Sequence, residues 1–229
     1  MKVFEHLKSE WFRYGFETLA VIVGILAAFA LDSWNDTRKS KDLEQELLNQ
    51  FITDLHTDIE SIDEVNAWHD SIIFSCEVLV DHLKNRMPFN DSLKKHFDMW
   101  NDFETLVFSS GAISNLNSRG VELISDVDLR NHILQLYNKY YPHSLKDNQY
   151  FREDHVQITY KIQLDRIEPI QWQESAMPND YEALFDDQVF INHVQWIRNA
   201  AMFNQRENED LIHEINAVIE HIEQVQNKE

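Results

Sequence analysis

Glycine and proline are scarce in this 229-residue chain, which contains only four of each. Average proteins have about 7% glycine and 5% proline, and β-rich folds need both residues at their many tight turns. A β-sandwich, a barrel or a Rossmann sheet is therefore disfavoured, and the composition predicts an all-α fold. The scarcity also argues against a glycine-rich phosphate-binding loop, and neither a G-x-S-x-G nor a Walker motif is present.

Basic residues are also few, because 20 lysines and arginines face 40 aspartates and glutamates, a formal net charge of −20. Binding to nucleic-acid phosphates requires a cationic face, so this balance argues against a nucleic-acid-binding protein. Cys76 is the single cysteine, which rules out an intrachain disulfide. One cysteine is compatible with the cytosol and equally with a periplasmic domain that is stable without disulfides.

One long apolar stretch lies near the beginning of the chain. Residues 18–31 carry no charge but measure only about 21 Å as a helix, short of the ~30 Å hydrocarbon core. Aromatic residues extend the stretch, and the 24 residues from Trp11 to Trp34 would measure about 36 Å, with both tryptophans where interfacial belts occur. We therefore predict a transmembrane helix within an amphipathic N-terminal segment at residues 1–36, followed by an acidic helical domain at residues 37–229.

Two other interpretations of this stretch stay open. Ala28-Phe29-Ala30 matches the A-x-A cleavage pattern of a secretory signal peptide, and a buried core helix of a soluble protein has a similar composition. The long, mixed-charge stretch before residue 19 is a poor start for a signal peptide. Trp34, followed by basic residues at 38–41, is typical of the end of a membrane span. These features favour an uncleaved anchor.

Helical periodicity gives the apolar stretch two different faces. Ala20, Gly24 and Ala28 recur at four-residue spacing on one face, and the larger apolar side chains lie on the other. Small residues at this spacing let two helices approach closely in a bilayer, which predicts that the span self-associates. The alternative is that alanine and glycine are simply common in membrane helices.

Two charges lie inside the aromatic boundaries of the span. Arg13 and Glu17 are four residues apart, so their side chains share a helix face and can pair near the interface. A carboxylate inside a membrane is also a candidate proton or ion site. If this protein belongs to a channel or transport assembly, Glu17 is the residue expected to lie on the conducting path.

The orientation of the span is weakly encoded. Three basic residues lie on each side of it, so the positive-inside rule does not choose between the two directions. Residues 42–229 carry 14 basic and 35 acidic side chains, and an anionic cytoplasmic leaflet would repel such a domain. This repulsion favours the outer side of the membrane.

Beyond the span, apolar residues at 43–83 recur at spacings of three and four, the pattern of an amphipathic helix. Residues 25–87 contain no glycine or proline, so the membrane helix is expected to continue into a long rod. Breaks near Asp36 and in the polar stretch at residues 66–70 stay open. A last helix of about 40 residues, starting near residue 186, matches the rod in length and predicts a long-helix antiparallel bundle.

Shorter elements are predicted in the middle of the chain. A helix beginning near Leu93 is expected to end at Ser109-Ser110-Gly111, and a short helix with Ile113 and Leu116 is expected to follow before Gly120. Capping-box spacing at residues 125–128 predicts the start of another helix. Pro142 is expected to end that helix. Residues 169–185 contain two prolines and little periodicity, which predicts an ordered loop with a short helix.

Short motifs in two parts of the chain carry a family resemblance. The motifs are Gly24-Ile25-Leu26 and Ser33-Trp34-Asn35-Asp36 near the span, and Ser109-Ser110-Gly111, Glu122-Leu123-Ile124-Ser125, Leu129-Arg130-Asn131 and Leu136-Tyr137 in the domain. With them, most of residues 10–165 resembles an uncharacterised bacterial family of single-span proteins whose helical extramembrane domain has unknown function. The resemblance implies an inner-membrane protein with a periplasmic domain, and it implies no activity.

Candidate residues for chemistry are few, although the chain has 11 histidines. There is no H-E-x-x-H motif, and an acidic helix produces the spacing of Asp210, His213 and His221 by chance more often than for a metal. Cys76 lies on the apolar stripe and is expected to fill the core. Arg130 is expected to form a structural ion pair or to contact an anion or a partner. No cofactor is expected.

Taken together, the patterns predict a non-enzymatic, membrane-anchored helical protein that acts in interaction, scaffolding or sensing and that self-associates. Its expected partners are the lipid bilayer and a second copy or another membrane protein, without nucleic acid. Two alternatives are a bundle enzyme that binds a metal or ligand between helices, and an accessory subunit of a membrane channel or transport assembly.

Overall fold

A computed structural model describes residues 2–102, 104–171 and 174–228. Within these ranges the side chains of residues 2–16, 147–155, 169 and 171 lie outside the description. The chain divides into two compact units, residues 1–48 and residues 49–229, and each is described by itself.

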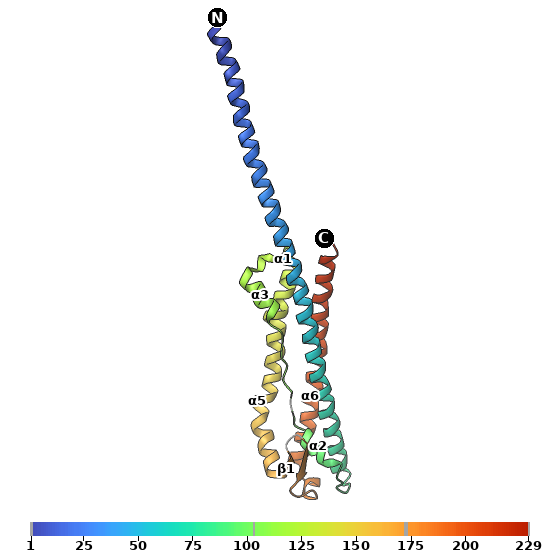
Figure 1. Cartoon of the computed structure of the whole chain (residues 1–229). Helices are drawn as coiled ribbons and strands as arrows, with labels where there is room; N and C mark the ends of the chain where they lie inside the picture. The colour runs from blue at the N-terminus through green and yellow to red at the C-terminus, as the bar shows by residue number, and fades with distance from the viewer. Residues whose placement is uncertain (1, 103, 172–173, 229) are drawn as a thin grey trace. The chain divides into compact units, whose positions relative to one another are not determined.

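The chain is mostly helical, as the composition predicts (Figure 1). Its α-helices are α1 (Lys2–Lys84), α2 (Leu93–Met99), α3 (Gly111–Arg119), α4 (Val127–Gln135), α5 (Tyr141–Arg166) and α6 (Gln188–Gln226). Shorter turns are the 3-10 helices η1 (Val121–Leu123) and η3 (Ala183–Phe185) and the π-helix η2 (Leu136–Tyr140). Two strands, β1 (Ile167–Gln171) and β2 (Ser175–Pro178), form an antiparallel pair.

Helix α1 is a single element of 83 residues, so it has no break at Asp36 or in the polar stretch at residues 66–70. The absence of glycine and proline over residues 25–87 removes the two residue types that most often interrupt a helix. In the first unit, the Thr37 hydroxyl donates to the Ser33 carbonyl at 2.8 Å, within the helix. Lys39 Nζ and Asp36 Oδ1 form a salt bridge of 3.9 Å. Both side chains are exposed, so this salt bridge contributes little stability.

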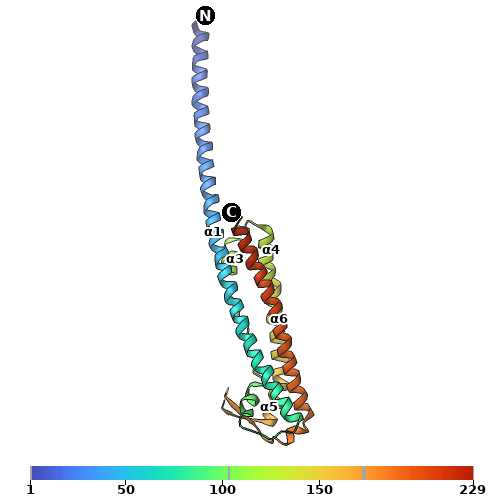
Figure 2. The same ribbon diagram turned by 90° about the vertical axis from the view of Figure 1, so that its right-hand side faces the viewer.

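In the second unit, polar contacts join α1 to α6 along their length. Asn208 Nδ2 donates to Asn66 Oδ1 at 2.8 Å, and Gln226 Nε2 donates to Asn49 Oδ1 at 3.1 Å. Nearer the other end of α1, Lys84 Nζ donates to Gln195 Oε1 at 3.0 Å. The residue number in α6 falls as that in α1 rises, so the two helices run in opposite directions here (Figure 2).

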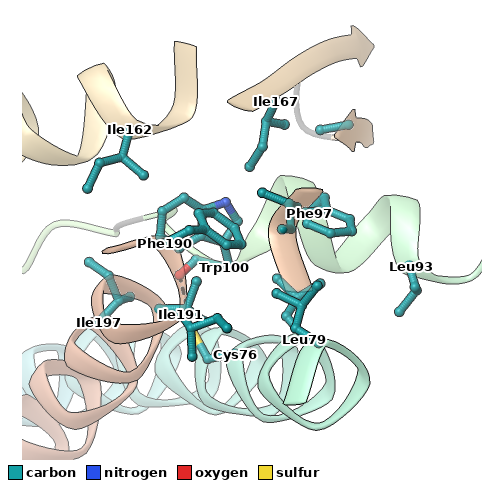
Figure 3. Packing of buried hydrophobic residues seen from close by; sticks show 14 of the residues in the cluster. Cys76, Leu79, Leu93, Phe97, Trp100, Ile162, Ile167, Phe190, Ile191 and Ile197 are labelled. Carbon is teal, nitrogen blue, oxygen red and sulfur yellow. Dashed lines mark hydrogen bonds between the residues drawn. The ribbon is translucent and has the colours of Figure 1, made fainter. Parts of the chain in front are cut away.

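A hydrophobic cluster of the second unit lies where α2, α6 and the strand pair meet the end of α1 (Figure 3). Trp100 and Phe190 are fully buried, with ring centroids 5.3 Å apart in an edge-to-face arrangement. The ring of Phe97 stacks against Phe190 at 6.4 Å. Cys76 is buried in this cluster, as its place on the apolar stripe predicts, and its thiol donates to the Trp100 carbonyl at 3.4 Å.

The expectation for residues 169–185 is wrong in part, because this region contributes to β1 and β2 and only three of its residues form η3. The all-α prediction therefore needs one small β-hairpin added to it. Ile167 pairs with Pro178 and Pro169 pairs with Ala176. Proline is tolerated in both strands because each strand of a two-stranded sheet is an edge, where a missing N–H disrupts no inner ladder.

Two boundaries in the middle of the chain differ from those expected, and the predicted helix start at residues 125–128 is confirmed by α4. Helix α2 ends at Met99, well before the Ser109-Ser110-Gly111 motif expected to end it. The short helix expected before Gly120 is present as α3, and the motif lies at its start. Asp126 caps α4 by accepting from the Leu129 N–H at 2.9 Å. Pro142 does not end a helix but lies in the first turn of α5, where the missing N–H is least costly.

Candidate functional site

One polar cluster of the second unit centres on Asp58, which is fully buried on α1. Its Oδ1 accepts a hydrogen bond from the Ser109 N–H at 2.6 Å, and its Oδ2 accepts one from the Tyr141 hydroxyl at 2.6 Å. One turn earlier, Asp54 Oδ2 accepts from the Ala112 N–H at 2.7 Å. Two carboxylates of α1 thus hold the backbone of residues 109–112, and we call this arrangement the α1 carboxylate clamp.

The clamp supplies a hydrogen-bond acceptor that the start of α3 lacks. The first N–H groups of a helix have no partner within that helix, and the N-cap residue Ser110 makes no side-chain cap hydrogen bond. Residues four apart on a helix share a face, so Asp54 and Asp58 point the same way. Asp54 therefore supplies the acceptor that Ser110 does not, and a negative charge at a helix N-terminus is itself stabilising.

Gly111 allows the close approach of this segment to α1. A Cβ atom at residue 111 would lie 3.1 Å from Gln50 Nε2 and 3.3 Å from Asp54 Oδ2, tighter than ordinary contacts. Gln50 Oε1 accepts from Asn115 Nδ2 at 3.1 Å, so it must keep its position to serve α3. The glycine of the Ser109-Ser110-Gly111 motif thus has a steric explanation, because a larger residue would crowd the side chains of α1.

Aromatic rings enclose the clamp. The rings of Phe108 and Tyr141 stack at 4.1 Å, and Tyr137 meets Tyr141 edge to face at 5.0 Å. Phe51, on α1, completes the enclosure through its contact with Tyr137 at 5.9 Å. The π-helical turn η2 separates α4 from α5 and contains Tyr137, and such turns are frequent at functional sites.

Burial dominates the electrostatics of the clamp. It raises the pKa of Asp58, against the opposing effect of the hydrogen bonds from Tyr141 and Ser109, and nearby Asp54 raises that pKa further. Burial also raises the pKa values of Tyr137 and Tyr141, and the charge of Asp58 adds to both shifts. Both phenols therefore stay protonated, and Tyr141 remains a donor to Asp58. The Tyr137 hydroxyl is buried without a hydrogen-bond partner.

A second polar pair joins α4 to α6. The Nδ1 atoms of His132 and His221 are 3.3 Å apart, and their ring centroids are 5.6 Å apart. Burial lowers the pKa of His132, His221 lowers it further, and Glu214 acts in the opposite direction. The sequence offered His213 as the neighbour of His221, whereas the structure provides a histidine from another helix.

A buried hydroxyl–imidazole pair lies between α1 and α2, where the Ser75 hydroxyl and His96 Nδ1 are 3.0 Å apart. Both residues are buried. Burial lowers the pKa of His96, as do Lys95 and His82, and no carboxylate is among the groups that shift it. A serine nucleophile needs access to substrate and a base oriented by a carboxylate, so this pair does not form a catalytic triad.

The residues predicted for the span lie in the first unit. Glu17, Ala20, Gly24, Ala28 and Trp34 are all exposed there, and a Cβ atom at Gly24 would meet nothing within 4 Å. The small-residue face is therefore sterically open in the single chain. Trp11 and Arg13 belong to α1, but their side chains lie outside the described residues.

Arg130 is half-buried on α4, where its Nη1 donates to the carbonyl of Ile124 at 3.4 Å. This contact ties the beginning of α4 back to the turn before it. Within residues 17–102, 104–146 and the later described stretches, no group of three or more His, Cys, Asp or Glu side chains is arranged to hold a metal.

The sequence analysis does not predict the clamp, although the apolar stripe of α1 contains a sign of it. Buried positions on α1 recur as Phe51, Leu55, Asp58 and Ile62, so an aspartate occupies a position of the apolar stripe. A buried carboxylate is rare unless it is paired, which makes such a position a candidate site. The sequence alone does not say which donors meet it, because Ser109 and Tyr141 are 51 and 83 residues away.

Comparisons with known proteins give one match. Neither the curated proteins nor the solved structures contain a match to this chain. A family model described as "Family of unknown function (DUF6090)" matches residues 17–161, a segment that contains the apolar stretch and the whole α1 carboxylate clamp. Because this match covers more than half of the 229 residues, the chain belongs to the DUF6090 family.

Proposed function

We propose that this protein is a single-span, membrane-anchored helical protein that acts by contact or sensing rather than by turnover. Its second unit would be a long-helix antiparallel bundle on the periplasmic side of a bacterial inner membrane. The lipid bilayer is the first partner, and a second copy or another membrane protein is the next.

The observation that carries the proposal is the exposure of the apolar part of α1. One helix of the described chain is long and apolar enough to cross a membrane, and none of its apolar window is buried. Leu26 and Phe29 are 61% and 69% exposed. Soluble proteins rarely leave such a continuous apolar surface in water, which supports lipid or another helix as its cover.

The expected free energy of membrane insertion also supports an anchor. Eight Leu, Ile, Val and Phe side chains lie within residues 18–31, and each contributes about −0.3 to −0.6 kcal/mol to insertion at the helix centre. Their sum is about −2 to −5 kcal/mol. Glu17 and Asp32 flank this stretch, near the interfaces, where charged side chains cost less than at the centre.

Membrane fractionation of the full chain tests the anchor. We expect the uncut protein to sediment with membranes, to resist alkaline carbonate and to dissolve in detergent, with an intact-mass measurement showing the original N-terminus. Ile22→Lys combined with Leu26→Lys raises the insertion free energy by about 6–8 kcal/mol, which exceeds the favourable sum. This variant should leave the membrane fraction.

A matched control adds the same two charges outside the apolar stretch. Asn35→Lys combined with Thr37→Lys should sediment as the unchanged protein does. If the unchanged, uncut chain stays in the supernatant after high-speed centrifugation without detergent, the anchor is wrong. Protease added to spheroplasts tests orientation, because a periplasmic domain would be cleaved while the inner membrane is intact.

Self-association of the span is the finer part of the proposal. Ala20, Gly24 and Ala28 leave one face of the helix open to close packing. Gly24→Leu should weaken dimerisation in liposomes at least tenfold, measured by energy transfer between labelled copies. Val23→Leu changes the larger-residue face and should not. Equal association of both variants would argue against packing through the small face.

A further inference from the structure

His132 and His221 come from different helices and face each other in the second unit. Their Nδ1 atoms are 3.3 Å apart, and the planes of their rings are inclined by 49°. The two residues are 89 positions apart in the chain, so only the packing of α4 against α6 brings them together. Both side chains are half-buried, which leaves a path for a small solute.

The separation of the two nitrogen atoms suits a shared metal ion. Zinc binds imidazole nitrogen at about 2.0–2.1 Å with tetrahedral geometry, which places two nitrogen ligands about 3.3 Å from each other. If the two Nδ1 atoms point directly at each other, each ring must turn by about 35° to reach the tetrahedral angle at a common ion. Rotation of the two side chains can supply this turn, and the backbones of α4 and α6 would not need to move.

The charges around the pair favour a cation. Glu214, which precedes His221 by two turns on α6, acts electrostatically on His132. Asp126, the N-cap residue of α4, interacts electrostatically with His221 and with Lys228. One carboxylate therefore acts on each imidazole, in a chain whose net charge is −20.

We propose that His132 and His221 form a binding site for one divalent transition-metal ion of the zinc type, which bridges α4 and α6. No third His, Cys, Asp or Glu ligand completes the site among the described residues, so water would fill the remaining positions. Imidazole ligands favour zinc, nickel and copper over calcium and magnesium. A site with two protein ligands binds its metal more weakly than the closed four-ligand sites of structural zinc.

Bound metal would also tie the C-terminal part of α6 to α4. A ligand that binds only the folded state stabilises that state in proportion to the logarithm of its concentration over its dissociation constant. The site therefore provides a way for the domain to respond to metal without catalysing a reaction. It does not depend on the membrane anchor, since the two histidines and their neighbours all belong to the second unit.

The test uses the full chain in detergent micelles, without a histidine tag and after treatment with EDTA. Titration with zinc chloride against a chromophoric competitor should show one ion bound per chain. Cobalt(II) chloride should give the visible absorption of a coordinated ion at the same stoichiometry. Calcium chloride should not compete, because calcium prefers oxygen ligands.

Two variants and one control assign the site. His132→Ala and His221→Ala should each weaken zinc binding at least tenfold and abolish the zinc-dependent rise in the thermal unfolding midpoint. His213→Ala removes an exposed histidine two turns from His221 on α6 and should bind like the unchanged chain. Circular dichroism establishes that each variant is folded.

Two results would overturn the proposal. One is the absence of saturable zinc binding by the unchanged, folded chain at concentrations up to 1 mM, roughly the weakest affinity that would still be specific. The other is binding that persists unchanged in both His132→Ala and His221→Ala. Either result would leave the pair as a hydrogen bond between helices and nothing more.

Discussion

The carboxylate of Asp58 accepts a hydrogen bond of 2.6 Å from the hydroxyl of Tyr141, a residue 83 positions further along the chain. The same carboxylate accepts from the Ser109 N–H. Asp58 therefore links α1 both to the segment that leads into α3 and to the start of α5. The contribution of this clamp, and of the core beside it, can be measured on full-length protein in detergent micelles.

Tyr141→Phe should lower the free energy of unfolding by about 1–3 kcal/mol, because the buried Asp58 carboxylate loses the hydroxyl that donates to its Oδ2. Urea denaturation followed by circular dichroism measures the change. Tyr160→Phe removes a hydroxyl from a side chain that is 57% exposed, and it should change the free energy by less than about 0.5 kcal/mol. Equal effects of the two variants would show that the bond to Asp58 contributes no stability.

Asp58→Asn should remove one component of the pH dependence of stability. Burial raises the Asp58 pKa above its ordinary value of 3.8, so the folded state binds the proton more tightly than the unfolded state. The contribution of Asp58 is therefore greatest below the unfolded pKa and is lost as pH rises through the folded pKa. The stability of the unchanged protein relative to Asp58→Asn should fall across this window, by at most about 1.4 kcal/mol per pH unit.

Urea midpoints measured between pH 3.5 and pH 8 provide this comparison, since most other carboxylates are common to both proteins and cancel in the difference. Asp63→Asn changes an exposed aspartate on the same helix and serves as the control. This control shows how much the loss of one exposed negative charge changes the urea midpoint by itself. A flat difference between the unchanged protein and Asp58→Asn would contradict the raised pKa.

Gly111→Ala should be destabilising by about 1 kcal/mol, because the new methyl group meets Gln50 Nε2 at 3.1 Å and disturbs the bond from Asn115 to Gln50. Gln50→Ala removes the obstacle. In that background Gly111→Ala should cost less than in the unchanged protein, because the contact with Asp54 Oδ2 at 3.3 Å remains while alanine restricts the unfolded chain more than glycine does. Additive free energies in this double-mutant cycle would mean that Gln50 is not the limiting contact.

The Cys76 thiol should be almost unreactive in the folded protein. Its side chain is fully buried, and burial raises its pKa to about 12, so very little thiolate forms near pH 8. We expect a thiol-specific reagent to modify Cys76 at least a hundredfold more slowly in buffer than in concentrated urea. Rapid modification in buffer would show that the cluster around Trp100 opens readily.

Elements that depend on local pattern were predictable. The three- and four-residue spacing and the lack of glycine and proline predicted the long first helix and the final helix, which extends over Gln188–Gln226. The extent of the middle elements was less predictable. Leu106 and Val107 are apolar but lie outside any helix or strand, and Leu106 is buried by tertiary contacts that local spacing does not describe.

Of the candidate site, only fragments could be inferred from sequence. Ser109-Ser110-Gly111 and Leu136-Tyr137 stood out as motifs, and the structure brings both to α1, with Asp58 as the partner of Ser109. Spacing along the last helix offers His213 as the neighbour of His221. The actual neighbour, His132, lies on α4, and a helix-face argument considers one helix at a time.

The amino-acid sequence by itself determined the helical character of the chain, the apolar stretch at residues 18–31 and the acidic balance of residues 42–229. These properties depend on residue type and on spacings within one helix. The tertiary structure decided that Asp58 meets Tyr141 and that His132 meets His221. Such pairs form only when separate helices pack in one particular rotation and register, and that choice is made by the whole buried surface rather than by any local run of residues.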